Sequence, residues 1–364
     1  MPNKKLVLLS PSLGPGGLQR AISVLANYFA EHANREVYII LYGISKQQFY
    51  PLNERVQVHT PDFDFKNKKR FYYSLKTMLF IRGKIKTLKP DAVLSFGEYW
   101  NSFVLLSLLG LSYPVYISDR CQPDKSLGRV HNWLRKVLYP MAAGIILQTT
   151  TARDIYAKII RHSNIEVIGN PIQGFVSSEG IDKENIILSV GRLIPSKHHD
   201  LLIDIFLACY EPGWKLVIAG GDVVNGNVFK QLKAKVVAMN AEDKIELTGN
   251  INHVNKYYQK SKVFAFTSSS EGFPNVIGEA MAAGLPVIAF DCVAGPSDMI
   301  DDDKNGFLIP LFDQKLFVKK LSLLMNNEQL RMQMGAAAIE SIQKFNPELI
   351  GQKYNDFLFS TEIG

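Results

Sequence analysis

Short apolar runs alternate with longer amphipathic stretches along almost the whole chain, and this alternation limits the fold more than any other feature. In the first half, the runs predicted to be strands are 5–10, 36–42, 56–60, 92–96, 115–118, 144–148 and 166–168. Stretches of helical pattern separate most of them, for example 18–31, 69–88 and 128–138. Strands joined through helices pair in parallel, so we predict an α/β fold with a doubly wound sheet.

A polar segment interrupts this alternation in the middle of the chain. The pattern stops near Pro171, and the stretch 173–183 is rich in the Gly and Ser typical of a linker. Predicted strands then resume at 185–190, 215–219, 244–247, 263–266, 286–290 and 307–309. The length of 364 residues also suits two domains. We therefore predict one domain over 1–172 and a second over 173–345.

Charge is divided unevenly between these two parts. Residues 1–172 carry 23 Lys and Arg against 11 Asp and Glu, a net of +12, while the remainder carries 18 against 23, a net of −5. A basic half indicates an anionic partner, such as nucleic acid, an anionic membrane surface or a phosphate-bearing acceptor, or only a solvated basic surface. Nucleic acid is the weaker alternative, because no recognisable binding module accompanies the charge.

Cysteine use and hydropathy favour a cytoplasmic protein. The three cysteines, Cys121, Cys209 and Cys292, are widely spaced and form neither a metal-ligand pair nor a disulfide framework. The longest apolar stretch, 103–117, is interrupted by Ser, Gly and Pro. It falls short of the roughly 18 apolar residues that a membrane span needs, so we expect no membrane crossing.

Two glycine-containing loops follow predicted strands. Gly16 and Gly17 precede the first predicted helix, where small residues and a helix N-terminus suit a phosphate, although a tight turn would use the same residues. In the second domain, Arg192 and Lys197 bracket a short loop after the strand at 185–190. Arg can hold a diphosphate bidentately and Lys adds a mobile charge, whereas two solvated surface charges are the alternative.

The strongest motif follows the predicted strand 263–266. Glu271 lies on a loop, and Glu279 lies in the second turn of a helix that we expect to begin near Asn275. Carboxylates accept hydrogen bonds from sugar hydroxyls, and the start of the helix between them offers N–H groups to a phosphate or sugar oxygen. A capped helix with a solvated Glu at each end is the alternative, which the Gly and Pro beside Glu271 make less attractive.

These motifs resemble those of the retaining family-4 glycosyltransferases. Residues 271–279 are similar to the E-x7-E motif of that family, and 280–288 continue the likeness. Further matches are Gly191-Arg192 with Lys197 to the diphosphate loop, Gly16-Gly17 to the first phosphate loop, and 305–308 to a late strand. The resemblance covers nearly the whole chain and is closest to bacterial members that act on lipid-linked oligosaccharides.

The resemblance implies a GT-B fold, with two Rossmann-like domains, an interdomain cleft, and a C-terminal helix, 346–364, that returns to the first domain. The first domain would bind the acceptor and the second the donor nucleotide-sugar. Glu271, Arg192 and Lys197 would be catalytic, with the cations stabilising the leaving diphosphate. The donor site would also include Gly16, Gly17, Gly272, Phe273, Pro274, Asn275, Val276 and Glu279.

One segment departs from the family pattern. Many members carry a His after a strand in the middle of the first domain, where this chain has Ser118-Asp119-Arg120-Cys121. Asp119 could take a sugar hydroxyl and Arg120 a phosphate or acceptor group. Neither assignment follows from the residues alone, so the identity of any general base is in doubt.

Metal binding is not expected, although two segments carry the D-x-D pattern of metal-dependent transferases. They are 62–64 and 301–303, and the second reads better as a polar turn. His198 and His199 lack a third ligand at metal-binding spacing, so we interpret them as the start of a helix. We expect no cofactor beyond the nucleotide-sugar co-substrate.

The stretch 66–89 carries nine Lys and Arg beside an apolar stripe of Phe71, Leu75, Met78, Leu79 and Ile85. It could lie on an anionic bilayer or hold a pyrophosphate-linked acceptor, or it could be a packed helix with a solvated basic face. We expect a cytoplasmic protein, with peripheral contact at the inner face of the membrane.

The combined prediction is a metal-independent retaining hexosyltransferase of bacterial polysaccharide or oligosaccharide assembly. The donor would be a UDP-sugar, such as a UDP-N-acetylhexosamine, and the acceptor a glycan hydroxyl, with a lipid-linked acceptor favoured. The alternatives are a non-catalytic nucleotide-sugar-binding partner of an assembly complex and a GT-B epimerase.

Overall fold

The computed structural model describes residues 3–43, 48–174, 182–251 and 253–359. The chain divides into two compact units, of which unit 1 comprises Met1–Pro171 with Pro347–Gly364 and unit 2 comprises Ile172–Asn346. Each boundary lies one residue from the position expected from the sequence. The predicted linker lies mostly outside the described residues.

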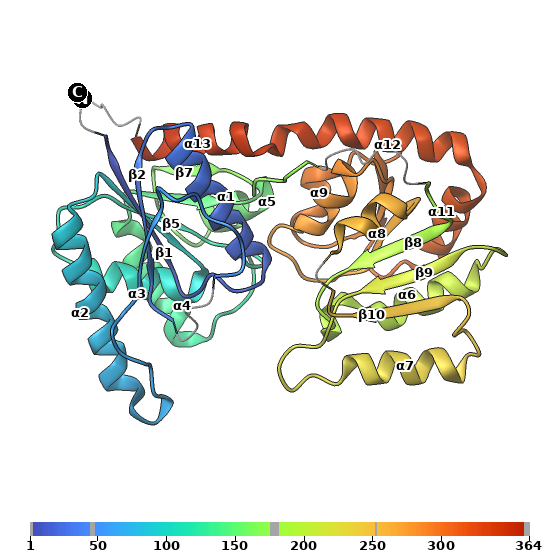
Figure 1. Ribbon diagram of the computed structural model, residues 1–364, viewed down its shortest axis with the longest axis horizontal. Coiled ribbons are helices and arrows are strands. Elements are labelled where there is room, and N and C mark those ends of the chain that lie inside the picture. The colour runs from blue at the N-terminus through green and yellow to red at the C-terminus, as the bar shows by residue number, and fades with distance from the viewer. Residues whose placement is uncertain (1–2, 44–47, 175–181, 252, 360–364) are drawn as a thin grey trace. The chain divides into compact units, whose positions relative to one another are not determined.

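Unit 1 is built on a parallel sheet of seven strands (Figure 1), in the order β3-β2-β1-β4-β5-β6-β7. The strands are β1 (Lys5–Ser10), β2 (Glu36–Leu41), β3 (Gln57–His59), β4 (Ala92–Phe96), β5 (Val115–Ser118), β6 (Gly144–Leu147) and β7 (Ile165–Val167). The helices are α1 (Gly17–Glu31), α2 (Arg70–Leu88), α3 (Glu98–Leu108), α4 (Arg129–Leu138), α5 (Thr150–Ala157) and α13 (Pro347–Phe359).

Alternate residues of the strands of unit 1 face opposite layers of helices. Val7 and Leu9 pack in one core cluster with Ile81 and Ile85 of α2. Helices α1 and α13 also pack closely. The contact leaves no room for a side chain at Gly351 of α13, where a Cβ atom would lie only 2.3 Å from the ring of Tyr28 of α1. The C-terminal helix therefore belongs to unit 1, although 175 residues of unit 2, Ile172–Asn346, precede it.

Unit 2 is built on a parallel sheet of six strands, in the order β10-β9-β8-β11-β12-β13. The strands are β8 (Ile186–Val190), β9 (Lys215–Ala219), β10 (Ile245–Gly249), β11 (Val263–Phe266), β12 (Val287–Asp291) and β13 (Gly306–Pro310). The helices are α6 (His199–Ala208), α7 (Val228–Ala238), α8 (Asn255–Lys260), α9 (Asn275–Ala282), α10 (Pro296–Met299), α11 (Gln314–Asn326) and α12 (Glu328–Ile342). All thirteen predicted strands are present, which confirms the expected α/β fold with two doubly wound sheets.

Both sheets have one point at which the strand order reverses. In unit 1 the chain runs from β1 outward to β3 and then returns to place β4 beside β1. In unit 2 it runs from β8 outward to β10 and returns to place β11 beside β8. Ligands of open α/β sheets bind beyond the strand ends at such a point, because the two flanking loops diverge there.

Candidate functional site

The two strongest motifs of the sequence meet at the switch point of unit 2. The loop after β8 and the loop after β11 are joined by hydrogen bonds. The N–H of Ser269 donates to the carbonyl of Ser196 over 2.9 Å, and the hydroxyl of Thr267 donates to the carbonyl of Lys197 over 2.8 Å. The Nε2 atom of His198 lies 2.8 Å from the hydroxyl of Ser269. These bonds hold the cationic loop against the carboxylate loop.

Lys197 and Glu271 form an ion pair at this junction. The Nζ atom of Lys197 donates to Oε1 of Glu271, and the two side chains are only 15% and 13% exposed. The same Nζ atom lies 5.1 Å from the centre of the Phe266 ring. An ion pair with so little solvent is stable only while both partners are present. A diphosphate bound here would therefore compete with Glu271 for Lys197.

Arg192 lies on the same loop but has a different environment. Its side chain is exposed, and no carboxylate of the described residues forms an ion pair with it. Its neighbours are fixed, because Gly191 donates to the carbonyl of Ala219 over 3.0 Å and Leu193 donates to that of Gly221 over 2.9 Å. A cation on an anchored backbone can bind an anion with little loss of backbone freedom.

The loop 271–275 leads from Glu271 through Gly272 into α9, which begins at Asn275 followed by Val276. Phe273 is buried with its ring 5.2 Å from that of Phe345. Pro274 packs directly against Gly295. A Cβ atom added to Gly295 would lie 2.3 Å from Cδ of Pro274. No side chain of the described residues caps α9, so the positive end of the helix faces this loop.

Glu279 lies in the second turn of α9, as the sequence predicted, and is buried. The hydroxyl of Tyr258 donates to Oε2 of Glu279 over 3.0 Å, and Tyr258 itself is fully buried. This bond fixes the orientation of the carboxylate. A nucleotide ribose would share Glu279 with Tyr258, a residue that the sequence analysis did not select.

Gly16 and Gly17 lie at the start of α1 in unit 1, where Gly17 is the first residue of the helix. The carbonyl of Gly16 accepts from the N–H of Arg20 over 3.0 Å, and no side chain caps this end in the part of the chain that the structure describes. The position is thus a helix N-terminus beyond a strand end, as expected for a phosphate loop.

Asp119 is the centre of a buried polar cluster. Its carboxylate accepts hydrogen bonds from Asn101 over 2.7 Å, from Tyr139 over 2.8 Å and from Tyr156, and Arg135 pairs with it at 3.4 Å. Asp119 is only 5% exposed. These partners use the hydrogen-bonding capacity of the carboxylate within unit 1. The sugar contact of Asp119 stays a prediction.

Arg120 contacts the two chain segments that lead into and out of unit 2. Its guanidinium donates to the Oδ1 atom of Asn170, next to the end of the first segment of unit 1, and to the hydroxyl of Tyr354 on α13 over 2.7 Å. It also lies 5.0 Å from the ring centre of Phe96. These contacts give Arg120 a structural role; the predicted phosphate or acceptor contact stays a prediction.

The segment 301–303, considered as a metal site, has other partners. Asp302 accepts from the N–H of Leu308 over 2.9 Å, and Asp303 pairs with Lys320 at 2.7 Å, as in a polar turn beside a strand. No group of three His, Cys, Asp or Glu side chains among the described residues is placed to hold a metal ion. Within those residues, too, every helix is too short or too polar to cross a membrane.

Two family models match consecutive parts of the chain. The model described as Glycosyltransferase Family 4 matches residues 15–173, and that described as Glycosyl transferases group 1 matches residues 174–341. Amylovoran biosynthesis glycosyltransferase AmsD of Erwinia amylovora is 31% identical over 366 residues, which cover 98% of this chain and 99% of AmsD. The chain belongs to the family-4 glycosyltransferases.

Two further proteins resemble this chain, one in sequence and one in fold. A Campylobacter jejuni enzyme is 26% identical over 96% of this chain and 97% of its own, and it is named GalNAc-α-(1->4)-GalNAc-α-(1->3)-diNAcBac-PP-undecaprenol α-1,4-N-acetyl-D-galactosaminyltransferase. The solved structure of Anabaena HepE in complex with UDP and glucose superimposes with a TM-score of 0.79 at 17% identity, covering 98% of this chain and all of that one, 100%. The expected GT-B fold is thereby confirmed.

Proposed function

We propose that this family-4 glycosyltransferase moves a hexose from a nucleotide diphosphate donor to a glycan hydroxyl, with retention at the anomeric carbon. The observation that carries the proposal is the Lys197–Glu271 pair, held beside Arg192 at the switch point of unit 2. Cations suit the diphosphate and carboxylates suit the sugar hydroxyls, so both halves of the donor have partners on adjoining loops.

The ion pair suggests the order of events on donor binding. The diphosphate takes Lys197 and Arg192, and Glu271, released from Lys197, accepts hydrogen bonds from the sugar. As the bond from the anomeric carbon to the diphosphate oxygen breaks, negative charge grows on that oxygen, where the two cations stabilise it. An acceptor hydroxyl forms the new bond on the face that the diphosphate leaves, and its proton passes to the departing diphosphate oxygen. Two cations and the start of α9 would do this without a metal ion.

The donor we propose is a UDP-sugar, with an N-acetylhexosamine favoured. The Campylobacter relative is named an N-acetylgalactosaminyltransferase, and the HepE structure contains UDP. Glu279, oriented by Tyr258, would accept from the ribose hydroxyls, and the loop from Gly272 to Val276 would present backbone groups to the sugar and phosphates.

The acceptor we propose is a lipid-linked glycan of bacterial surface polysaccharide or oligosaccharide assembly. The Campylobacter relative is named for an undecaprenol diphosphate glycan and AmsD for amylovoran biosynthesis. Unit 1 would meet the inner face of the cytoplasmic membrane as a peripheral protein, since α2 exposes Phe71, Leu75 and Leu79 among its cations. Met78 is only partly exposed and Ile85 is buried, so the predicted stripe on α2 is narrower than expected.

Membrane contact is tested by sedimentation with liposomes. We expect binding to vesicles that contain phosphatidylglycerol, reversed by about 0.5 M salt because screening shortens the reach of the cations. Absence of binding at low salt would remove this part of the proposal and leave the chemistry untouched.

The chemistry is tested by nucleotide release from a panel of UDP-, GDP- and ADP-sugars in EDTA, with and without a lipid-linked acceptor. We expect release from one UDP-sugar that the acceptor stimulates and that Glu271→Ala abolishes. Normal UDP binding with no release from any donor would favour a non-catalytic partner. Release that needs added metal would contradict the metal-independent mechanism, and conversion of the donor to another sugar nucleotide would indicate an epimerase.

A further inference from the structure

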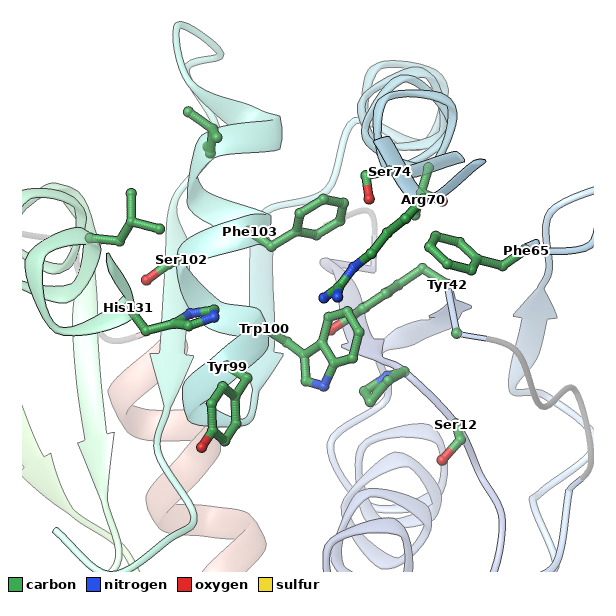
Figure 2. A pocket seen from close by; sticks show the side chains of 15 residues that line it. Ser12, Tyr42, Phe65, Arg70, Ser74, Tyr99, Trp100, Ser102, Phe103 and His131 are labelled. Atoms are coloured by element: carbon green, nitrogen blue, oxygen red, sulfur yellow. The ribbon is translucent and has the colours of Figure 1, made fainter. Parts of the chain in front are cut away.

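Unit 1 contains a pocket of about 780 Å³ (Figure 2). None of the residues assigned to the donor or catalytic site lines it, but Arg70, Ser74 and Thr77 come from the basic stretch 66–89. Its walls come from the ends of β1 and β2, from the segment before α2, and from α2, α3 and α4. The lining residues are Pro11, Ser12, Tyr42, Gly43, Phe65, Arg70, Ser74, Thr77, Tyr99, Trp100, Ser102, Phe103, Leu106, His131 and Leu134. Such a volume is within the range of small-molecule sites.

The pocket lies at the switch point of the first sheet. Ser12 follows the end of β1, and Tyr99 and Trp100 follow the end of β4, the neighbour of β1 on the other side of the reversal. This is the position at which open α/β sheets bind ligands. The pocket is therefore where the topology itself predicts a site, independently of its size.

Arg70 is the one Lys, Arg, Asp or Glu side chain among the described residues that line the pocket. Figure 2 shows its guanidinium pointing from the first turn of α2 into the pocket, toward the rings of Phe103 and Trp100. No carboxylate of the described residues forms an ion pair with it. Arg70 is exposed, so its guanidinium is accessible to an anion that enters the pocket, and its fork of donors fits a phosphate.

The rest of the wall is mostly apolar. Phe65, Trp100 and Phe103 present aromatic rings, and Leu106 and Leu134 present aliphatic groups (Figure 2 labels the three aromatic residues). Such a surface gains free energy by taking hydrocarbon out of water. A ligand that satisfies both parts of the pocket carries a phosphate at one end and an apolar chain at the other.

The outer surface of the same helices is also apolar. On α2, Phe71 is 87% exposed, and on α4, Trp133 is 61% exposed and is followed one turn later by the exposed Val137. Cations lie among them, including Lys136 on α4. This surface complements an anionic bilayer, so a chain anchored in that bilayer would reach the pocket along the helices that form its wall.

We propose that this pocket binds a phosphate or diphosphate ester of a long apolar chain, with the phosphate at Arg70 and the first part of the chain against Phe103 and Trp100. The assignment to the acceptor rests on the function proposed above, because a lipid-linked glycan has this chemistry at its lipid end. Binding by the pocket does not depend on that function, and it can be measured without any transfer.

The test is a titration of the full-length protein with farnesyl monophosphate below its micelle concentration. Trp100 lines the pocket and reports binding through its emission, in a background in which the exposed Trp133 is replaced by Phe. The third tryptophan, Trp214, is buried in unit 2 and gives a constant background. Farnesol lacks the phosphate, inorganic phosphate lacks the chain, and dihexanoylphosphatidic acid represents a membrane lipid. We expect farnesyl monophosphate to bind at least tenfold more tightly than each of the other three.

Two variants locate the site. Arg70→Met should weaken farnesyl monophosphate by about tenfold or more, the loss expected for a charged hydrogen bond, and should change farnesol less than twofold. Ser74→Phe, which adds a ring to the pocket wall, should weaken both. Lys86→Met, which removes an exposed cation near the other end of α2, is the matched control and should change neither. An unchanged far-UV circular dichroism spectrum and an unchanged thermal unfolding curve show that each variant is folded.

The proposal is overturned if Arg70→Met and Lys86→Met behave alike, if inorganic phosphate binds as well as farnesyl monophosphate, or if soluble N-acetylhexosamines shift the Trp100 emission more strongly. Equal binding of dihexanoylphosphatidic acid would assign the pocket to membrane lipid instead of the acceptor carrier. Farnesyl monophosphate binding in a protein that transfers no sugar would refute only the proposed function. Transfer to a lipid-linked acceptor that Arg70→Met and Ser74→Phe leave unchanged would refute the assignment of the pocket to the acceptor.

Discussion

Lys197 and Glu271 lie 74 positions apart in the sequence, and their side chains form an ion pair with 15% and 13% exposure. The sequence motifs identify both residues separately, one as a ligand for diphosphate and the other as a ligand for sugar. Their pairing means that the site without a donor is neutral at this point. The same two residues therefore affect both the stability of the fold and the proposed catalysis. Single and double substitutions can separate these two effects.

Replacing Lys197 by Met should lower both stability and activity. Glu271 would keep its charge in a poorly solvated place without a partner, which costs about 3 kcal/mol of unfolding free energy. The double variant Lys197→Met/Glu271→Gln should recover most of that loss in chemical denaturation while staying inactive. Equal stability of the single and double variants would show that the pair is not buried in solution.

Arg192→Gln should lower activity without lowering stability. The side chain is exposed and forms no ion pair within the described residues, so the melting temperature should not change. The kcat should fall by about 10²–10³-fold, as for a lost donor to a developing negative charge. Lys230→Gln, an exposed cation on α7, is the control and should affect neither quantity. A normal kcat in Arg192→Gln would remove this residue from the proposed mechanism.

Gly295→Ala should disturb the loop that carries Glu271. Gly295 has φ +103°, and a Cβ atom there would lie 2.3 Å from Cδ of Pro274, so the loop must move. We expect a higher KM for the donor and a loss of about 1–3 kcal/mol of stability. Gly213→Ala, with φ +84° and its nearest contact at 4.0 Å, imposes similar backbone strain without the clash and should leave KM unchanged.

His199 makes unit 2 sensitive to acid. Burial, with the charge of Lys197 as a smaller cause, lowers the pKa of His199 from 6.5 to about 4, while Asp200 opposes the shift. The unfolded state therefore binds more protons between pH 6.5 and 4, and stability falls as the pH falls through this window.

The loss should reach about 3 kcal/mol near pH 4, and His199→Gln should lack this acid limb. Unfolding of both proteins at a series of pH values gives the difference directly. Parallel curves for the wild type and the variant would contradict a neutral, buried His199.

The strands could be predicted because parallel strands are buried on both faces and read as continuous apolar runs. Val263–Phe266, with all four residues buried, was recognised in this way. The partners of Asp119 could not be predicted because they are distant from it in the sequence. They are Asn101, Arg135, Tyr139 and Tyr156.

The proposed donor loops could be selected from the sequence because each motif is contiguous and follows a strand. The pocket of unit 1 as a whole was missed, because its walls come from several elements and no short stretch contains them together. Only the stretch 66–89, which contributes Arg70, Ser74 and Thr77, was considered for a pyrophosphate-linked acceptor. One signal was available, since Tyr99 and Trp100 follow the strand that ends at Phe96. Aromatic residues just beyond a strand end are therefore worth selecting along with the charged ones.

The central claim is a metal-independent transfer with retention at the site of Lys197 and Glu271. Its most direct test is the anomeric configuration of the product, read by NMR after transfer from the donor that the panel identifies, in EDTA. The account predicts an α-linked product from an α-linked UDP-sugar and none from Glu271→Ala. A β-linked product, or a product formed only with added metal, would contradict it.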